Sequence, residues 1–440
     1  MPGVDLEALR ARLAATPTLK PSGSVKAVTG LAVRVRLPGA RIGDVAVLHR
    51  RGAPLLGEIV GFDGGEVLVV PIGDVTGLGP DDPVESTGLP LEIGAGAALL
   101  GRVVDGLGRP IDGGPPLAGL VPAAVDAPPP PALRRPRVSE PLYTGVRVID
   151  GLLTLGVGQR VGLFAGSGVG KSSLLGAMAR GTSADVVVVA LIGERGREVG
   201  EFLEVSLGAG GRARSVVVVA TSDAAAIERL RAAQVATAIA EHFRDAGKSV
   251  LLLIDSITRV ARAQREVGLA AGEPPTRRGY PPSVFAMLPR LLERGGLAER
   301  GAITAVYTVL VEGGDLDEPI ADEVRGILDG HIVLSREIAA RGRYPAVDVG
   351  HSLSRVMDRV ASGDHRAAAA AVRRLLAAFE EKRDLIALGA YARGSDAWVD
   401  RAISAAPELE RFLTQAHDEV APAEAIVSAL VRLAQRHAAA

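Results

Sequence analysis

Residues 159–173 read Gln-Arg-Val-Gly-Leu-Phe-Ala-Gly-Ser-Gly-Val-Gly-Lys-Ser-Ser, an apolar run that enters a glycine-rich turn ending in Gly-Lys-Ser. This order is typical of a phosphate-binding loop between a strand and a helix, because glycines let successive backbone N–H groups point at phosphate oxygens. A helix expected from about Lys171 to Arg180 aims its positive dipole end at the same anion. Ala165 stands where the strict pattern has glycine, which is tolerable if its φ is negative.

The loop predicts a site for a magnesium nucleotide. Lys171 would neutralise the β- and γ-phosphates, and the Ser172 hydroxyl would ligate Mg²⁺. Asp255 ends the apolar run 250–254, where such a protein needs an acid to orient the water shell of the ion. The predicted metal-side residues are thus Ser172 and Asp255, and the predicted nucleotide-binding residues of the loop are Gly166, Ser167, Gly168, Val169, Gly170, Lys171, Ser172 and Ser173.

A second apolar run, 186–192, ends in the charged loop Gly-Glu-Arg-Gly-Arg-Glu at 193–198. Glu194 is a candidate to orient and polarise the attacking water, because phosphoryl transfer relies on positioning and electrostatics. Taken alone, a charged loop of this kind is more often a solvated turn. This candidate therefore depends on the phosphate-binding loop upstream.

The rest of the chain divides into segments that differ in composition and in the spacing of apolar residues. Continuous apolar runs that alternate with helical stretches predict an α/β domain with a parallel sheet covered on both faces. Short alternating runs broken by Gly, Pro and Asp predict a small β-barrel before it, and an Ala/Leu/Arg/Glu-rich end predicts helices with a loop near 389–396. The expected parts are an amphipathic helix in 1–21, a barrel over 22–93, a RecA-like domain with its Gly/Pro-rich connection over 94–363, and a helical domain over 364–440. The expected strands of the sheet are Val161–Phe164, Val186–Ile192, Val216–Ala220, Val250–Ile254, Ile303–Val311 and His331–Leu334.

Composition narrows the class of protein. The 440 residues carry a net charge of −1, so no global field recruits nucleic acid or an anionic membrane. The absence of cysteine excludes disulfides and thiolate metal sites. The chain shows no signal peptide and no apolar run long enough to span a bilayer, so we expect a cytoplasmic protein that reaches a membrane only through partners.

Several segments resemble known ATPases. The loop at 193–198 is similar to that of the rotary ATPase superfamily, and 345–355, Pro-Ala-Val-Asp-Val-Gly-His-Ser-Leu-Ser-Arg, matches its Pro-x-x-Asp-x-x-x-Ser-x-Ser-Arg signature. Gln-Arg-Glu-Val-Gly-Leu-Ala-Ala-Gly-Glu-Pro-Pro at 264–275, Arg-Gly-Tyr-Pro-Pro-Ser-Val-Phe at 278–285 and Tyr-Thr-Val-Leu-Val-Glu-Gly at 307–313 resemble type III secretion ATPases more narrowly. These are the export motors of flagella and injectisomes, and the likeness covers about residues 20–405.

The resemblance implies roles for matched positions. It agrees with the roles given above to Lys171, Ser172, Asp255 and Glu194. It further implies that Arg259 positions groups near the γ-phosphate, that Tyr344 stacks on adenine, and that Arg355 is an arginine finger inserted into the site of a neighbouring subunit. Without the family, Tyr344 would be interpreted as a half-buried core tyrosine and Arg355 as a surface salt-bridge residue.

The resemblance also implies an assembly and an activity. Rotary ATPases divide the catalytic carboxylate and the finger arginine between two kinds of subunit, whereas this chain carries both, which favours a homohexamer. The implied function is Mg²⁺-dependent ATP hydrolysis that releases chaperones and unfolds export substrates. The implied partners are a stator or regulator protein, a central stalk, the export gate and chaperone–substrate complexes.

Two alternatives stay open at this point. One is a subunit of an ATP synthase or vacuolar-type pump, which the segments at 264–275 and 278–285 disfavour. The other is a hexameric RNA helicase, whose barrel needs stacking aromatics and a basic groove. Residues 21–93 hold one aromatic, Phe62, and six Lys/Arg against nine Asp/Glu, so nucleic acid is not an expected partner. The sequence does not choose between a flagellar and an injectisome system.

Overall fold

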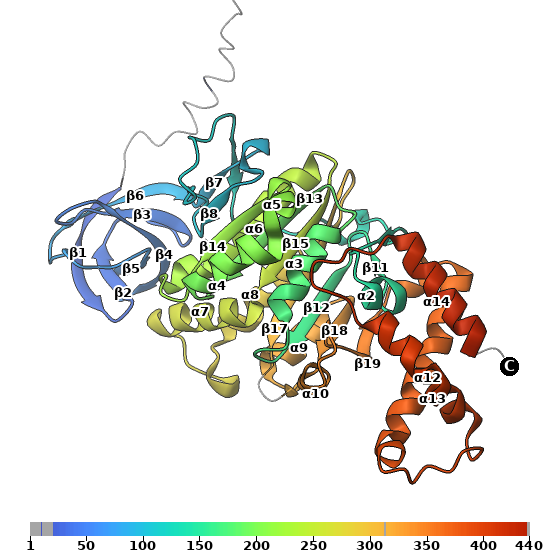
Figure 1. Cartoon of the computed structure of the whole chain (residues 1–440). Helices are drawn as coiled ribbons and strands as arrows, with labels where there is room; N and C mark the ends of the chain where they lie inside the picture. The colour runs from blue at the N-terminus through green and yellow to red at the C-terminus, as the bar shows by residue number, and fades with distance from the viewer. Residues whose placement is uncertain (1–9, 11–20, 312–313, 438–440) are drawn as a thin grey trace, which may run out of the picture.

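The computed structural model describes residues 10, 21–311 and 314–437. A β-barrel, a central α/β domain and a set of C-terminal helices follow one another along the chain and lie in that order from left to right in Figure 1. Most of the segment 1–21, where an amphipathic helix is expected, lies outside the described residues.

The first part is a closed six-stranded barrel with the strand order β1-β2-β5-β4-β3-β6. Val33 and Val35 of β2 are fully buried inside it, because alternate side chains of a strand point to the same face. Glu58 of β4 accepts a hydrogen bond of 2.7 Å from Arg231 of the central domain, which ties the two parts together. The barrel strands are β1 (Ser22–Thr29), β2 (Ala32–Arg36), β3 (Asp44–Leu48), β4 (Leu55–Asp63), β5 (Glu66–Pro71) and β6 (Pro83–Pro90).

The Gly/Pro-rich connection is more structured than its composition suggests. β7 (Glu92–Ala95) pairs with β9 (Val121–Ala124), and β8 (Val103–Asp105) joins the edge of the central sheet beside β14. Three residues are too few to show a periodicity in sequence, so β8 is found only through its pairing. The remaining short elements are η1 (Ala97–Leu99), η2 (Ala132–Arg134), and β10 (Pro141–Leu142) paired with β11 (Leu155–Gly156).

The central sheet confirms the expected parallel architecture. Its order is β19-β18-β12-β17-β15-β13-β14-β8, and all neighbours are parallel except the edge pair β18 and β19. A short strand, β16 (Gly296–Leu297), pairs antiparallel with β17. The main strands are β12 (Arg160–Ala165), β13 (Val186–Ile192), β14 (Ser215–Ala220), β15 (Ser249–Asp255), β17 (Ala302–Leu310), β18 (Gly330–Leu334) and β19 (Val347–Ser354).

Both faces of the sheet are buried, so its strands are apolar throughout. Val186 and Val188 of β13 pack into the core on one face, and Val187 and Val189 pack into the core on the other. One face is covered chiefly by α6 (Ala226–Asp245), α7 (Ile257–Ala270), α8 (Pro282–Leu292) and α9 (Pro319–Ile327). The other elements of the domain are α2 (Arg147–Leu152), α3 (Lys171–Gly181), α4 (Gly196–Glu201), the π-helix η3 (Phe202–Leu207), α5 (Gly208–Ala213), η4 (Arg277–Gly279), α10 (Arg336–Ala340) and α11 (Met357–Val360).

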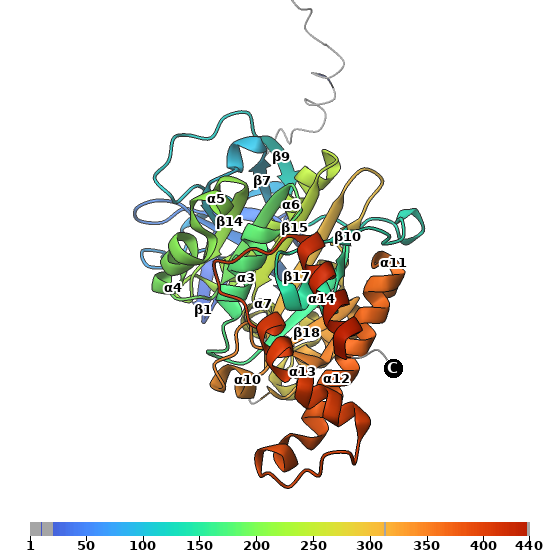
Figure 2. The ribbon, with the colours of Figure 1, turned by 45° about the vertical axis from the view of Figure 1, so that its right-hand side comes forward.

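The C-terminal part is helical, as expected. It consists of α12 (Gly363–Ala387), α13 (Ala397–Leu413) and α14 (Ala423–His437), with the expected loop between α12 and α13. Buried Leu375, Phe412 and Leu430 belong to the same apolar core as α2 and α3, so these helices pack directly on the central domain. Figure 2 shows the connection between α13 and α14 passing beside α3. Within the described part of the chain, no helix is long and apolar enough to cross a membrane.

Candidate nucleotide site

The glycine-rich turn lies between β12 and α3, at the carboxyl edge of the sheet. This is the edge where ligands of parallel sheets bind. Gly168 and Gly170 have φ values of 78° and 85°, which only glycine adopts without strain. Ala165 ends β12 and is not among the residues with positive φ, so its substitution for glycine is accommodated as expected.

Lys171, Glu194 and Asp255 meet beside the loop, and we call them the lysine cluster. The Lys171 ammonium donates hydrogen bonds to Asp255 Oδ1 at 2.5 Å and to Glu194 Oε1 at 3.3 Å. All three side chains are largely buried. Three residues that are far apart in the sequence are therefore brought within direct contact at one point.

The parallel register explains why the two carboxylates converge. β13 and β15 are neighbours, and Leu191 of β13 is paired with Asp255 of β15. Both chains leave the sheet at the same edge, so Glu194, three residues beyond Leu191, lies next to Asp255. Thr308 of β17 on the other side of β15 donates a hydrogen bond of 2.8 Å to Asp255 Oδ1, which fixes the rotation of that carboxylate.

Arg259 also joins this site. It lies in the first turn of α7, and its Nε is 3.6 Å from Glu194 Oε1, an ion-pair distance too long for a good hydrogen bond. The Arg259 Nε–H is buried and has no hydrogen-bond partner in the described part of the chain. Gly193 makes room for it, because a Cβ on Gly193 would lie 2.4 Å from Arg259 Cδ.

The charges of this group balance one another. Burial by itself lowers the pKa of Lys171, but the charges of Asp255 and Glu194 outweigh burial, and the net pKa of Lys171 is raised. Lys171 is thus a firmly charged ammonium. Two cations, Lys171 and Arg259, face two carboxylates, so a phosphate chain entering the site competes with Asp255 and Glu194 for Lys171.

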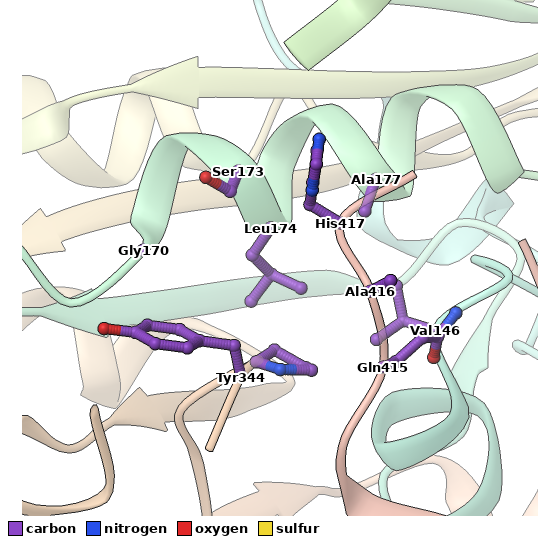
Figure 3. Close-up of a pocket in the computed structure, with 10 residues that line it drawn as sticks. Val146, Gly170, Ser173, Leu174, Ala177, Tyr344, Gln415, Ala416 and His417 are labelled. Carbon is purple, nitrogen blue, oxygen red and sulfur yellow. The ribbon is translucent and has the colours of Figure 1, made fainter. Parts of the chain in front are cut away.

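A mostly apolar pocket adjoins the loop (Figure 3). Tyr344 is 44% exposed, and its ring packs beside Gly170, where a Cβ would lie 3.3 Å from Tyr344 Cδ1. Leu174 of α3 points into the pocket (Figure 3). An apolar pocket beside a phosphate-binding loop has the character of a nucleobase site, and the adenine-stacking role of Tyr344 stays a prediction. The lining residues are Val146, Gly170, Ser173, Leu174, Ala177, Tyr344, Pro345, Gln415, Ala416 and His417.

Gln415, which the sequence does not single out, connects this pocket to the C-terminal helices. It lies between α13 and α14 and is buried. Its backbone N–H donates to Tyr344 O at 2.9 Å, and its side chain accepts from Arg147 N and donates to Gly145 O, both at 2.8 Å. Gln415 therefore holds the backbone of Tyr344 and the segment before α2 in one arrangement.

Arg355 does not join the site of its own chain. It follows β19 at the edge of the sheet, and Ser354 is paired with Gly330 at the start of β18. The Arg355 N–H donates to Asp329 O, and the Asp329 N–H donates to Arg160 O at the start of β12. The phosphate-binding loop follows the other end of β12, roughly 16 Å further along a strand that rises about 3.3 Å per residue. The exposed Arg355 side chain thus lies too far away to contact phosphates in its own site.

The residues present fit a magnesium nucleotide. No group of three or more His, Cys, Asp or Glu side chains that could hold a metal ion occurs among the described residues. Mg²⁺ in phosphate-transfer sites needs only one or two protein oxygens, since water and phosphates supply the other ligands. Ser172 is exposed at the start of α3 and makes no hydrogen bond through its hydroxyl within the described ranges. Ser172 and Asp255 would hold the ion.

Comparisons with known proteins match each of the three parts of the chain. Residues 145–354 match the nucleotide-binding domain of the ATP synthase alpha/beta family, and residues 25–88 match the β-barrel domain of the same family. Residues 361–432 match the T3SS EscN ATPase C-terminal domain.

Individual relatives are similar over nearly the full length. A type 3 secretion system ATPase of Xanthomonas euvesicatoria is 55% identical over 406 residues, 91% of each chain. A flagellum-specific ATP synthase of Bacillus subtilis is 51% identical over 421 residues, 95% of this chain and 96% of the relative. The assembled ATPase EscN of the enteropathogenic E. coli type III secretion system superposes with a TM-score of 0.89 at 46% identity, over 93% of this chain and 99% of that one. A second structure shows EscN in complex with its central stalk EscO, with a TM-score of 0.87 over the same shares of the two chains and at the same 46% identity.

Proposed function

The chain belongs to the type III secretion and flagellum-specific ATPases of the ATP synthase alpha/beta family, and we propose that it hydrolyses ATP to drive protein export through a type III secretion apparatus. An ATP synthase or pump subunit and an RNA helicase are not favoured, since relatives that match more than nine-tenths of the chain are type III secretion and flagellar ATPases. The observation that carries the proposal is the lysine cluster, which gathers the phosphate-binding lysine and two carboxylates at one end of the sheet.

ATP binding begins with an exchange of partners at Lys171. The backbone N–H groups of the loop and the N-terminus of α3 attract the phosphate chain. Lys171 then turns from Asp255 and Glu194 toward the β- and γ-phosphates, and both carboxylates are released for their own tasks. Tyr344 and the apolar pocket hold the adenine, which fixes the phosphates against the loop.

The released carboxylates take different roles because their surroundings differ. Asp255 stays held by Thr308. With Ser172 it would hold Mg²⁺, which would neutralise charge that develops on the transferring phosphoryl group. Glu194 faces Arg259 and lies outside the strands, so its carboxylate can orient a water and take its proton. The water oxygen attacks the γ-phosphorus as the bond to the bridging oxygen breaks and ADP leaves. The Arg259 guanidinium, 3.6 Å from Glu194 Oε1, holds this carboxylate in place.

The position of Arg355 supports a site completed between subunits. Arg355 lies at the opposite end of β12 from the loop of its own chain, so in a ring it would serve the site of a neighbour. We propose a homohexamer in which every interface carries Glu194 from one copy and Arg355 from the next. EscN has been solved as an assembled ATPase and with a central stalk, which supports the same for this chain. A stator, the export gate and chaperone–substrate complexes complete the proposed partners, and the apparatus would hold the protein peripherally at the membrane.

Replacing Lys171 with alanine tests the proposed function. We expect the affinity for ATP to fall by about 10- to 100-fold, because the variant loses a charge-assisted contact to phosphate. Equilibrium binding of a fluorescent ATP analogue measures this, and Lys248→Ala, an exposed lysine before the other end of β15, is the matched control. Affinity for ATP equal to that of the unaltered protein in Lys171→Ala would refute the nucleotide site.

Replacing Gln415 with methionine tests the base pocket. The variant keeps the volume of the side chain but removes its hydrogen bonds to Gly145 O and Arg147 N. The backbone of residue 415, whose N–H holds Tyr344 O, is then less firmly placed. We expect the KM for ATP to rise about tenfold with kcat nearly unchanged, because the lysine cluster does not contact Gln415. Steady-state kinetics measure the split, with Gln234→Met on α6 as control. A fall in kcat at constant KM would contradict this role.

A further inference from the structure

Arg336 lies directly against the phosphate-binding loop although no sequence motif includes it. β18 runs parallel to β12, and Leu334 is paired with Ala165, the last residue before the loop. The chain therefore leaves β18 alongside the loop, and Arg336, the first residue of α10, comes next to Gly166. A Cβ on Gly166 would lie 2.7 Å from Arg336 Nε and 3.1 Å from its Cζ, so the guanidinium lies directly against the glycine backbone.

The guanidinium has no partner of its own in the described part of the chain. Arg336 is exposed and makes no side-chain hydrogen bond or ion pair there. Its neighbours differ: Arg343 in the same segment lies 3.6 Å from Glu410, and Arg259 lies 3.6 Å from Glu194. Arg336 therefore brings an uncompensated positive charge and free donors to the rim of the loop.

The segment that carries Arg336 reaches both ends of the loop. Arg336 touches Gly166 at the start of the turn, and eight residues later Tyr344 touches Gly170 at its end. Ser335 caps α10 by accepting a hydrogen bond from Ile338 N, which fixes where the segment leaves the sheet. The segment 335–344 thus places the Tyr344 ring beside the base pocket and the Arg336 guanidinium beside the start of the phosphate-binding loop.

We propose that Arg336 is a phosphate-binding residue that contacts the nucleotide of its own subunit, an inference that rests on the proposed function. The charges of Lys171, Arg259, Glu194 and Asp255 cancel, whereas a nucleotide triphosphate remains negative even with Mg²⁺. Arg336 supplies part of the missing positive charge within the subunit, and it is present before any neighbour contributes Arg355. Arg336 should therefore raise the binding affinity more for nucleotides that carry more phosphates.

Equilibrium binding with three nucleotides tests this role. In a Glu194→Gln background, which suppresses turnover, displacement of a fluorescent adenine nucleotide gives the affinities for ATP, ADP and AMP. Arg336→Met keeps the packing against Gly166 and removes the charge, and we expect about 10- to 100-fold weaker ATP binding, a smaller loss for ADP and no change for AMP. Arg336→Lys should recover part of the loss. Arg341→Met, which removes the same charge elsewhere in the segment, is the control.

The outcomes separate this inference from its premise. Failure of the unaltered site to bind ATP would overturn the proposed function itself. Normal ATP binding by Arg336→Met would overturn only the role of Arg336. An equal loss for AMP and ATP would also overturn it, because the arginine would then shape the loop without touching phosphate. Sedimentation measures whether the Arg336→Met protein still assembles. If this variant assembles poorly but binds nucleotides normally, Arg336 contacts a neighbouring subunit and not the phosphates in its own.

Discussion

Replacing Glu194 with glutamine is expected to lower the turnover number for ATP by about 100- to 10,000-fold, the usual contribution of a positioned general base. Glutamine keeps the size and hydrogen bonding of the side chain but cannot take a proton from water. ATP affinity should be retained, because Lys171 and Arg259 keep their charges and lose a competing carboxylate. Phosphate release gives the turnover number, and binding of a fluorescent ATP analogue gives the affinity.

Glu198→Gln is the matched control for this prediction. Glu198 belongs to the same charged loop, but its side chain is 41% exposed and pairs with Arg195 at 3.6 Å on the surface. Its loss should leave turnover nearly unchanged, because exposed pairs of this kind contribute little. If Glu194→Gln lowers turnover by less than about threefold, the carboxylate has no chemical role and Glu194 is only a loop residue.

Replacing Arg355 with alanine is expected to lower turnover by about 10³- to 10⁵-fold, the usual worth of an arginine finger. The intact protein should show specific activity that rises steeply with concentration, because each site needs a neighbour. Arg355→Ala should lose this rise while each subunit still binds ATP. Arg359→Ala, an exposed arginine one turn further on in α11, is the control. An Arg355→Ala protein with more than a tenth of normal activity would exclude the finger role.

The sequence predicts those parts of the site that are formed by residues close together in the chain. The loop at 165–173 is recognisable from its alternating glycines followed by Lys-Ser. The strands before Glu194 and Asp255 are recognisable because a sheet buried on both faces needs unbroken apolar runs. Glu194 and Asp255 converge on Lys171 because β13 and β15 are neighbouring parallel strands, an order that the apolar runs do not predict. The roles of Tyr344 and Arg355 came from family resemblance, since a lone tyrosine or arginine carries no pattern.

The residues that sequence reasoning missed act through packing across long separations. Gln415 reaches Gly145 and Arg147 over more than 260 positions, and nothing near it in the chain marks it as buried. Arg336 matters because β18 pairs with β12, a register that no periodicity reveals. Thr308 did leave a signal, because a hydroxyl inside the apolar run 302–310 needs a partner, and that partner is Asp255.

A mixing experiment tests the central claim, a site shared between identical subunits. Lys171→Ala subunits have a damaged pocket but still offer Arg355 to a neighbour, whereas Arg355→Ala subunits have an intact pocket and no finger. Rings that contain both kinds should include interfaces where an intact pocket meets an intact finger. ATP hydrolysis by the mixture should therefore exceed that of either variant alone at the same total concentration. If the two variants co-assemble and the mixture stays inactive, Arg355 does not act across the subunit boundary, and the shared-site account is wrong.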